Sequence, residues 1–110
     1  MLTLSPATRI YLATGATDLR KSFEGLTDLV THQFPAGPLS GQLFLFVNRR
    51  RNRLKVLASD GTGVWVCAKR LGRGRFAWPQ PTAPGAVQIR AEELTLLLRG
   101  LERDRTQARQ

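Results

Sequence analysis

The sequence predicts an α+β fold: an antiparallel β-meander of about five to six strands, packed by one long N-terminal helix, with a short C-terminal helix at the end. Three observations predict it. Residues 42–79 alternate apolar and β-branched runs with short breaks that carry Gly, Asn or Asp, which is typical of strands joined by hairpins. Residues 18–33 repeat apolar side chains at steps of three and four, as an amphipathic helix does. Leucines recur at helical spacing in residues 91–100.

The N-terminal third is predicted to contain one strand and the long helix. Arg9–Ala13 alternates well enough for a first strand. The helix is predicted at residues 18–33, because Thr17 is a good N-cap and Asp18 places negative charge where the helix dipole favours it. Its apolar stripe consists of Leu19, Phe23, Leu26, Val30 and Phe34. Arg20 lies off this stripe and is expected to face water.

The meander is predicted to hold four strands, at residues 43–47, 54–59, 64–69 and 75–78. The first is apolar at every position, so we expect a central strand that is covered on both sides. The turns between the strands are residues 48–52, 60–63 and 72–74. The second turn begins with Asp60-Gly61, which is typical of a tight hairpin.

The C-terminal third is predicted to add an edge strand and the short helix. A proline-rich loop, residues 79–85, leads to an edge strand at residues 87–89. The helix at residues 91–100 carries on one face Leu94, Leu97, Leu98 and Leu101. Gly100 is expected to end it. We therefore expect a single α+β domain over residues 1–101, followed by a polar, frayed tail at residues 102–110.

The charge balance indicates the class of partner. The 110 residues include 17 Lys and Arg against 8 Asp and Glu, a formal net charge of +9 and a pI of about 11.5. This favours a polyanion, most often nucleic acid. The alternative is a soluble basic protein whose arginines reflect a GC-rich genome. One cysteine, the absence of a signal sequence and the absence of a long apolar run lead us to expect a cytoplasmic protein with no membrane partner.

Nine of the 17 basic residues lie within residues 42–79, where Asp60 is the only carboxylate. Alternate turns of a meander lie at the same end of its sheet, so turns 48–52 and 72–74 should share one end, with Asp60 at the other. Like charges held together repel, which favours an anionic ligand there. The candidate nucleic-acid-binding residues are Arg49, Arg50, Arg51, Arg53, Lys55, Lys69, Arg70, Arg73 and Arg75. The alternative is a solvated rim of arginines.

The aromatic residues of the same stretch allow two interpretations. If they are exposed, Trp65, Phe76 and Trp78 add a stacking surface for bases. Otherwise they belong to the core.

The sequence offers little for catalysis. His32, the only histidine, is interpreted as a helix-end residue, and Cys67 as a small buried residue within a strand. No Cys and His spacing suits a metal, and the carboxylates are not grouped as a two-metal nuclease requires. We predict no catalytic residue, no metal and no cofactor.

Four blocks of the chain, in their order and spacing, resemble one family. They are Thr17-Asp18-Leu19-Arg20-Lys21-Ser22-Phe23-Glu24-Gly25-Leu26, then Phe44-x-Phe46 before Arg49-Arg50-Arg51-x-Arg53-x-Lys55, then Asp60-Gly61-x-Gly63, then Ala68-Lys69-Arg70-Leu71-x-x-Gly74-Arg75-Phe76-x-Trp78-Pro79. The family is the small accessory protein from the second open reading frame of insertion sequence 66-type elements. It is often called TnpB, a name shared with an unrelated RNA-guided nuclease. The likeness covers residues 6–101. Arg90 replaces the family's usual Ser or Thr cap before the last helix, which should weaken the helix start by ~1 kcal/mol.

The resemblance implies a bacterial accessory protein of DNA transposition, encoded beside a larger transposase that cuts the DNA. The leading hypothesis is a non-enzymatic factor whose basic patch binds element DNA or RNA. A second hypothesis is an adaptor that binds the transposase through the basic patch or the C-terminal helix. A third, an uncharacterised nuclease, would require metal-dependent cleavage. Oligomeric state is left open by the sequence.

Overall fold

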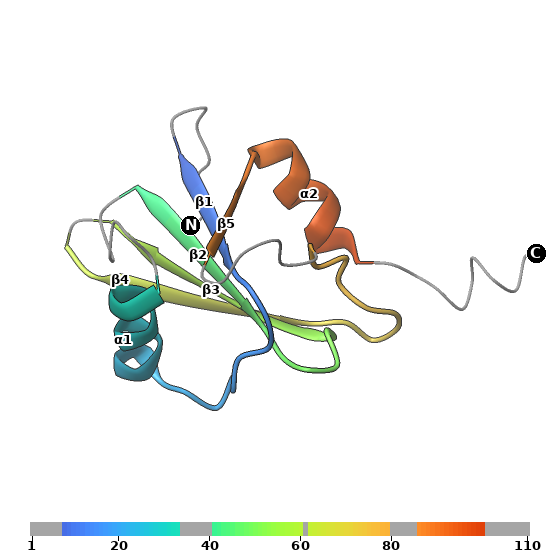
Figure 1. The fold of residues 1–110 in the computed structure, drawn as a ribbon, viewed down its shortest axis with the longest axis horizontal. Coiled ribbons are helices and arrows are strands. Elements are labelled where there is room, and N and C mark those ends of the chain that lie inside the picture. Colours follow the sequence, from blue (N-terminus) through green and yellow to red (C-terminus); the bar gives the residue numbers. More distant parts are fainter. Residues whose placement is uncertain (1–7, 34–40, 61, 80–85, 101–110) are drawn as a thin grey trace, which may run out of the picture.

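A five-stranded sheet with one helix on each face makes up the described part of the chain (Figure 1). The computed structural model describes residues 8–33, 41–60, 62–79 and 86–100. In chain order the elements are β1 (Arg9–Ala13), α1 (Phe23–Gln33), β2 (Gln42–Val47), β3 (Arg53–Ser59), β4 (Val64–Arg70), β5 (Ala86–Ile89) and α2 (Ala91–Arg99). The α+β class is as predicted, whereas the predicted strand arrangement and the long helix need correction.

The sheet is mixed rather than purely antiparallel. Its strand order is β4-β3-β2-β1-β5, and β2, β3 and β4 form the predicted antiparallel hairpins. The N-terminal strand β1, however, pairs with β2 in parallel. The reason is the connection between them: the chain leaves β1, passes through α1 and returns to the same end, and such a crossover makes two neighbouring strands parallel. The prediction of an all-antiparallel meander was therefore wrong at this pair.

The N-terminal helix is shorter than predicted. It has 11 residues and begins at Phe23, not at Asp18. Thr17 was expected to be the N-cap of this helix, but its N–H donates to the Val47 carbonyl at the end of β2, at 2.8 Å. The Ser22 carbonyl accepts the first helical hydrogen bond, from Leu26 at 2.9 Å. Residues 14–22 thus form an irregular connection, with a bend at residues 14–15 and a turn at residues 19–20, because a tertiary hydrogen bond competes with the first helical turns.

The core is divided by the sheet into two layers. All six residues of β2 are buried, which confirms the prediction of a central strand covered on both sides. Leu26 and Val30 of α1 pack over one face against Phe44, Phe46 and other side chains. Leu94 and Leu97 of α2 pack over the opposite face. The two helices lie on opposite sides of the sheet in Figure 1.

The predicted strand at residues 75–78 is not a strand. The Phe76 N–H donates to the Arg51 carbonyl at 2.7 Å, and the Trp78 indole N–H donates to the Ala13 carbonyl at 3.0 Å. Phe76 is 1% exposed and Trp78 is 6% exposed, and both belong to the core beneath α2. These two aromatic residues therefore cannot stack on bases, because the fold uses their apolar area to close one end of the sheet.

The C-terminal elements match the prediction closely. Strand β5 pairs antiparallel with β1 at the edge of the sheet. Helix α2 starts after Arg90, whose backbone N–H donates to the Glu93 side chain at 2.8 Å. This contact is one of the two hydrogen bonds of a capping box, and it forms although Arg90 stands where the family usually has Ser or Thr. The predicted tail at residues 102–110, most of the loop at residues 79–85, and the stripe residues Phe34 and Leu101 lie outside the described residues.

Gly100, which ends α2, is expected to resist substitution. Its φ is +77°, and an added Cβ would lie 2.7 Å from Leu71 Cδ1. Gly100→Ala should therefore lower the free energy of unfolding by about 1–2 kcal/mol, measured by urea denaturation. The control is Gly72→Ala, where an added Cβ meets nothing within 4 Å. Equal losses in both variants would contradict this account of the helix end.

Candidate functional site

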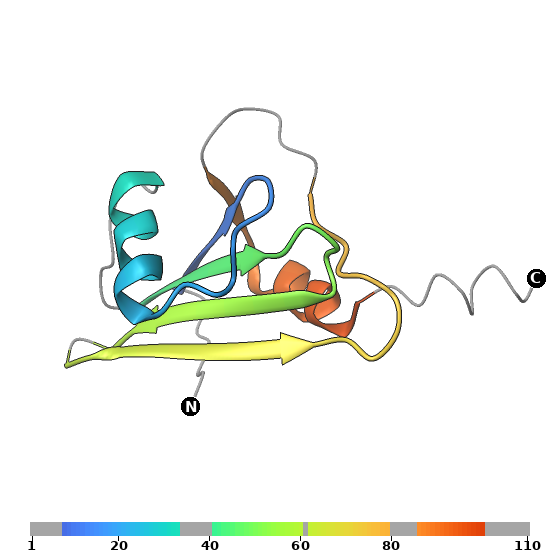
Figure 2. The same cartoon turned by 90° about the horizontal axis from the view of Figure 1, so that it is seen from below.

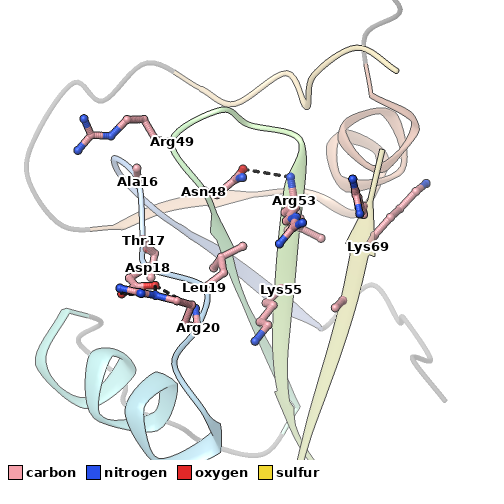
Figure 3. Close-up of a pocket in the computed structure, with 13 residues that line it drawn as sticks. Ala16, Thr17, Asp18, Leu19, Arg20, Asn48, Arg49, Arg53, Lys55 and Lys69 are labelled. Atoms are coloured by element: carbon pink, nitrogen blue, oxygen red, sulfur yellow. Dashed lines mark hydrogen bonds and ion pairs between the residues drawn. The ribbon is translucent and has the colours of Figure 1, made fainter. Parts of the chain in front are cut away.

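A groove opens between the segment that leads from β1 to α1 and the β3–β4 hairpin, with a volume of about 780 Å³ (Figure 3). The groove lies on the sheet face that α1 packs against. Leu57 of β3 and Val66 of β4 contact the core on that face, and side chains alternate along a strand, so Arg53, Lys55 and Arg70 project to the same face. Of the residues lining the groove, six are basic and one is acidic. They are Ala16, Thr17, Asp18, Leu19, Arg20, Asn48, Arg49, Arg53, Leu54, Lys55, Ala68, Lys69 and Arg70.

The two basic turns meet at one end of the sheet, as hairpin geometry predicted. The Leu71 N–H donates to the Asn52 carbonyl at 2.8 Å, and the following segment is tied to Arg51. Asp60 lies in the β3–β4 turn at the opposite end of both strands. Its carboxylate accepts the Thr62 and Gly63 N–H groups and the Trp65 indole N–H, at 2.9, 2.9 and 3.0 Å. These hydrogen bonds stabilise the carboxylate and hold the pKa of Asp60 well below its usual range, and the bond from the Thr62 N–H has the largest effect.

The groove floor holds three cations side by side. Arg53 of β3 lies directly opposite Arg70 of β4, and Lys55 lies two residues further along β3 on the same face. The neighbouring pair Asn52 and Leu71 is hydrogen-bonded through the backbone. Because hydrogen-bonded and non-hydrogen-bonded pairs alternate, Arg53 and Arg70 form a non-hydrogen-bonded pair, the type in which side chains are closest. Like charges directly opposite each other destabilise a sheet. Among the described residues, neither guanidinium forms an ion pair with a carboxylate.

The wall facing this floor carries an arginine that the sequence did not single out. Arg20 was expected to face water, and 91% of its side chain is exposed. It was also expected on the outer side of a helix, but residues 16–20 are not helical and border the groove. Its guanidinium donates to both carboxylate oxygens of Asp18, at 3.0 Å from Nε and 2.8 Å from Nη2 (Figure 3). Hydrogen bonds from Arg20 hold the pKa of Asp18 well below its usual range; the side chain has the largest effect, followed by the backbone N–H. The only acidic group of the lining is thus already neutralised by a neighbour.

Asn48 shapes the turn at the end of the groove. Its Oδ1 accepts the backbone N–H groups of Asn52 and Arg53, both at 3.0 Å, and its Nδ2 donates to Asn52 Oδ1 at 2.8 Å. Arg51 completes the turn in the left-handed region, at φ +60°. These bonds place Arg53 at the start of β3. Asn48 and Asn52 thus fix the conformation of a turn whose other residues are arginines.

The groove brings together some of the nine predicted residues. Five of them line the groove, namely Arg49, Arg53, Lys55, Lys69 and Arg70. The other four, Arg50, Arg51, Arg73 and Arg75, belong to the same end of the sheet but do not line it. Lys69 borders the groove but directs its ammonium to the opposite face of the sheet, where it donates to the Leu98 carbonyl in the last turn of α2 at 2.7 Å. Cations stabilise a helix at this end.

The residues considered for catalysis lie apart from the groove lining. His32 is exposed on α1, with Nδ1 2.7 Å from the Asp28 carbonyl oxygen. Cys67 is half-buried in β4. Within the described ranges, no three His, Cys, Asp or Glu side chains gather as a metal site would require. The described helices are also too short to cross a bilayer.

Comparison with known proteins places the chain in a family. The family model of IS66 Orf2-like proteins matches residues 8–108. The uncharacterized protein y4hO of Sinorhizobium fredii is 41% identical over 102 residues, which cover 93% of this chain and 88% of the relative. The uncharacterized protein y4jC of the same organism is 36% identical over 102 residues, covering 93% and 86%. No solved structure matches the chain significantly. The chain therefore belongs to the IS66 Orf2-like proteins, an accessory family of insertion sequences that is associated with transposition.

Proposed function

We propose that the groove binds the phosphate backbone of nucleic acid, and that the protein acts as a non-enzymatic factor that holds element DNA during transposition. The observation that carries this proposal is the directly opposed pair Arg53 and Arg70, beside Lys55 and without a carboxylate partner among the described residues. A sheet that holds like charges at its closest side-chain positions is stabilised when an anion lies between them.

The floor of the groove suits phosphodiesters in its chemistry. Arg53 and Lys55 are two residues apart on one strand and project to the same face, about 6.6 Å from each other. Arginine offers a planar fork that binds phosphate oxygens through two parallel hydrogen bonds. Such contacts position the backbone and carry no base specificity, so we expect similar affinity for different sequences.

The adaptor hypothesis has less support. Helix α2 buries Leu94 and Leu97 in the fold, and of its apolar residues Leu96 is the one strongly exposed, at 63%. The basic groove could meet an acidic protein surface, but its floor is a row of adjacent cations and suits a regular polyanion better. IS66 Orf2-like proteins are not a known enzyme family, and the proposed role requires no chemistry by this chain.

The test measures binding of a fluorescent DNA duplex from an element end across salt concentrations. The variant Arg53→Gln/Arg70→Gln should lose two phosphate contacts. Because each contact contributes about 0.9 to the slope of log K against log salt, the slope should fall by about 1.8, and affinity at 0.1 M salt by about 50-fold.

The matched control is Arg73→Gln/Arg75→Gln. It removes the same charge from two exposed arginines at the same end of the sheet, outside the groove lining. Its slope should change by less than half as much. Equal losses in the two variants would indicate a diffuse basic rim, and an unchanged slope in the groove variant would disprove the proposal. If DNA binding fails in every form while the neighbouring transposase is captured, the adaptor hypothesis replaces it.

A further inference from the structure

We propose that the free edge of β4 pairs with β4 of a second copy of this chain, antiparallel and symmetric about Cys67, so that two sheets join into one. This inference concerns how the protein assembles and does not depend on the groove binding nucleic acid. It rests on three features of β4: an open edge, the directions of its backbone groups, and the order of its side chains.

Strand β4 is a long edge strand that no other described element covers, and its charged residues, Lys69 and Arg70, lie together at its C-terminal end. It spans seven residues at the end of the strand order, and most of its residues are exposed. Figure 2 shows it along the lower margin of the sheet, with β3 on its inner side. The sequence Val64–Arg70 contains no proline or glycine. Natural sheets usually blunt such an edge with charged side chains, proline, a bulge, a short strand or a covering element, and in β4 the charges leave residues 64–68 without such protection.

The direction of each backbone group in β4 follows from two hydrogen bonds at the ends of its ladder. The Asp60 N–H donates to the Gly63 carbonyl at 3.2 Å, and the Leu71 N–H donates to the Asn52 carbonyl at 2.8 Å. Hydrogen-bonded and non-hydrogen-bonded pairs alternate in an antiparallel ladder. Residues 65, 67 and 69 therefore direct their N–H and C=O groups toward β3. The groups that point outward belong to Val64, Val66, Ala68 and Arg70.

These outward groups are complementary to themselves in one register. If Cys67 of one copy lies opposite Cys67 of the other, Val66 pairs with Ala68 and Val64 with Arg70, each through outward N–H and C=O groups. All seven residues of both strands are then paired. A shift by two residues in either direction keeps the groups matched but leaves only five residues of each strand paired. The symmetric register about Cys67 therefore forms the most hydrogen bonds.

The side chains favour the same register. It sets the cationic end of one strand, Lys69 and Arg70, against the apolar end of the other, Trp65 and Val64. The two Arg70 residues are then six residues apart, about 20 Å, so like charges do not meet. Trp65 is 47% exposed and Val64 is 38% exposed, and both would be partly covered. The Trp65 ring is already fixed by its bond to Asp60 at 3.0 Å, so little side-chain freedom is lost on pairing.

Paired residues of antiparallel strands project to the same face of a sheet. The two grooves would therefore open on one face of the joined sheet, with both rows of cations on it. A polyanion longer than one groove could then contact both copies.

The test is the mass of the protein in solution, measured by light scattering after gel filtration and by sedimentation equilibrium. We expect a dimer of twice the chain's 12.2 kDa. Ala68→Pro removes an N–H that points outward and spares the bonds to β3, so it should weaken dimerisation by about 100-fold through two lost hydrogen bonds and the added ring. Ala68→Thr keeps the N–H and is the matched control. Urea unfolding checks that both variants fold.

Register is tested by charge and by cross-linking. Val64→Arg places Arg opposite Arg70 and should weaken the dimer, and the double variant Val64→Arg/Arg70→Glu should restore it. Cys67 would lie opposite its copy in a non-hydrogen-bonded pair with Cα atoms about 4.5 Å apart, within disulfide reach. Diamide, which takes up two electrons and two protons from two thiols, should then give a covalent dimer that Cys67→Ser abolishes. A monomer at all concentrations, or a dimer that survives Ala68→Pro, would overturn the proposal.

Discussion

Phe44→Ala is expected to lower the free energy of unfolding by about 3–5 kcal/mol, a large part of the 5–15 kcal/mol typical of a folded domain. Phe44 is fully buried in the central strand, and its ring stacks on Tyr11 with centroids 5.7 Å apart. Helix α1 covers it through Leu26 and Val30. Truncation leaves a cavity between a strand and a helix that are held by many other contacts, so the site cannot collapse to fill it.

The matched control for this prediction is Phe23→Ala. Phe23 begins α1 and is 53% exposed, so its truncation should cost less than about 1 kcal/mol. Urea denaturation followed by circular dichroism measures both variants. Losses of similar size would show that α1 does not pack on β2 as described.

Trp78→Ala is expected to cost a similar 3–5 kcal/mol, although Trp78 lies outside the helices and strands. Its ring is 6% exposed beneath α2, and its indole N–H donates to the Ala13 carbonyl, 65 positions earlier in the chain. The substitution removes core volume and leaves the carbonyl at the end of β1 without this partner. Both effects act on the segment that closes one end of the sheet.

Trp65→Ala is the control for Trp78, since both indoles are hydrogen-bonded and only one is buried. At protein concentrations low enough for a monomer, Trp65→Ala should cost less than about 1.5 kcal/mol, because nearly half of its ring area is exposed in the folded chain. Calorimetry compares the melting temperatures of the two variants. A larger loss from Trp65 would contradict the burial of Trp78 in the core.

The elements with local signals could be predicted from the sequence. The alternation within residues 42–70 and the turn at Asp60 determined two hairpins, because each strand pairs with its neighbour in the chain and its pattern needs no distant partner. The same holds for the leucine spacing of α2 and for the shared end of the two basic turns. The charge of residues 49–55 and 69–75 also depends on sequence alone.

The remaining features depend on contacts between residues that are distant in the chain. The Thr17 bond to Val47 replaced the expected start of α1, and the Trp78 bond to Ala13 drew an expected strand into the core. The first of these bonds also placed Arg20 opposite the groove floor. Of the nine predicted cations, only some line this groove. Periodicity reports which face of an element is buried but not which distant element buries it, because burial energy has no direction. Local sequence patterns therefore specify the hairpins and their charge, whereas long-range hydrogen bonds and packing specify which of those charges share a groove.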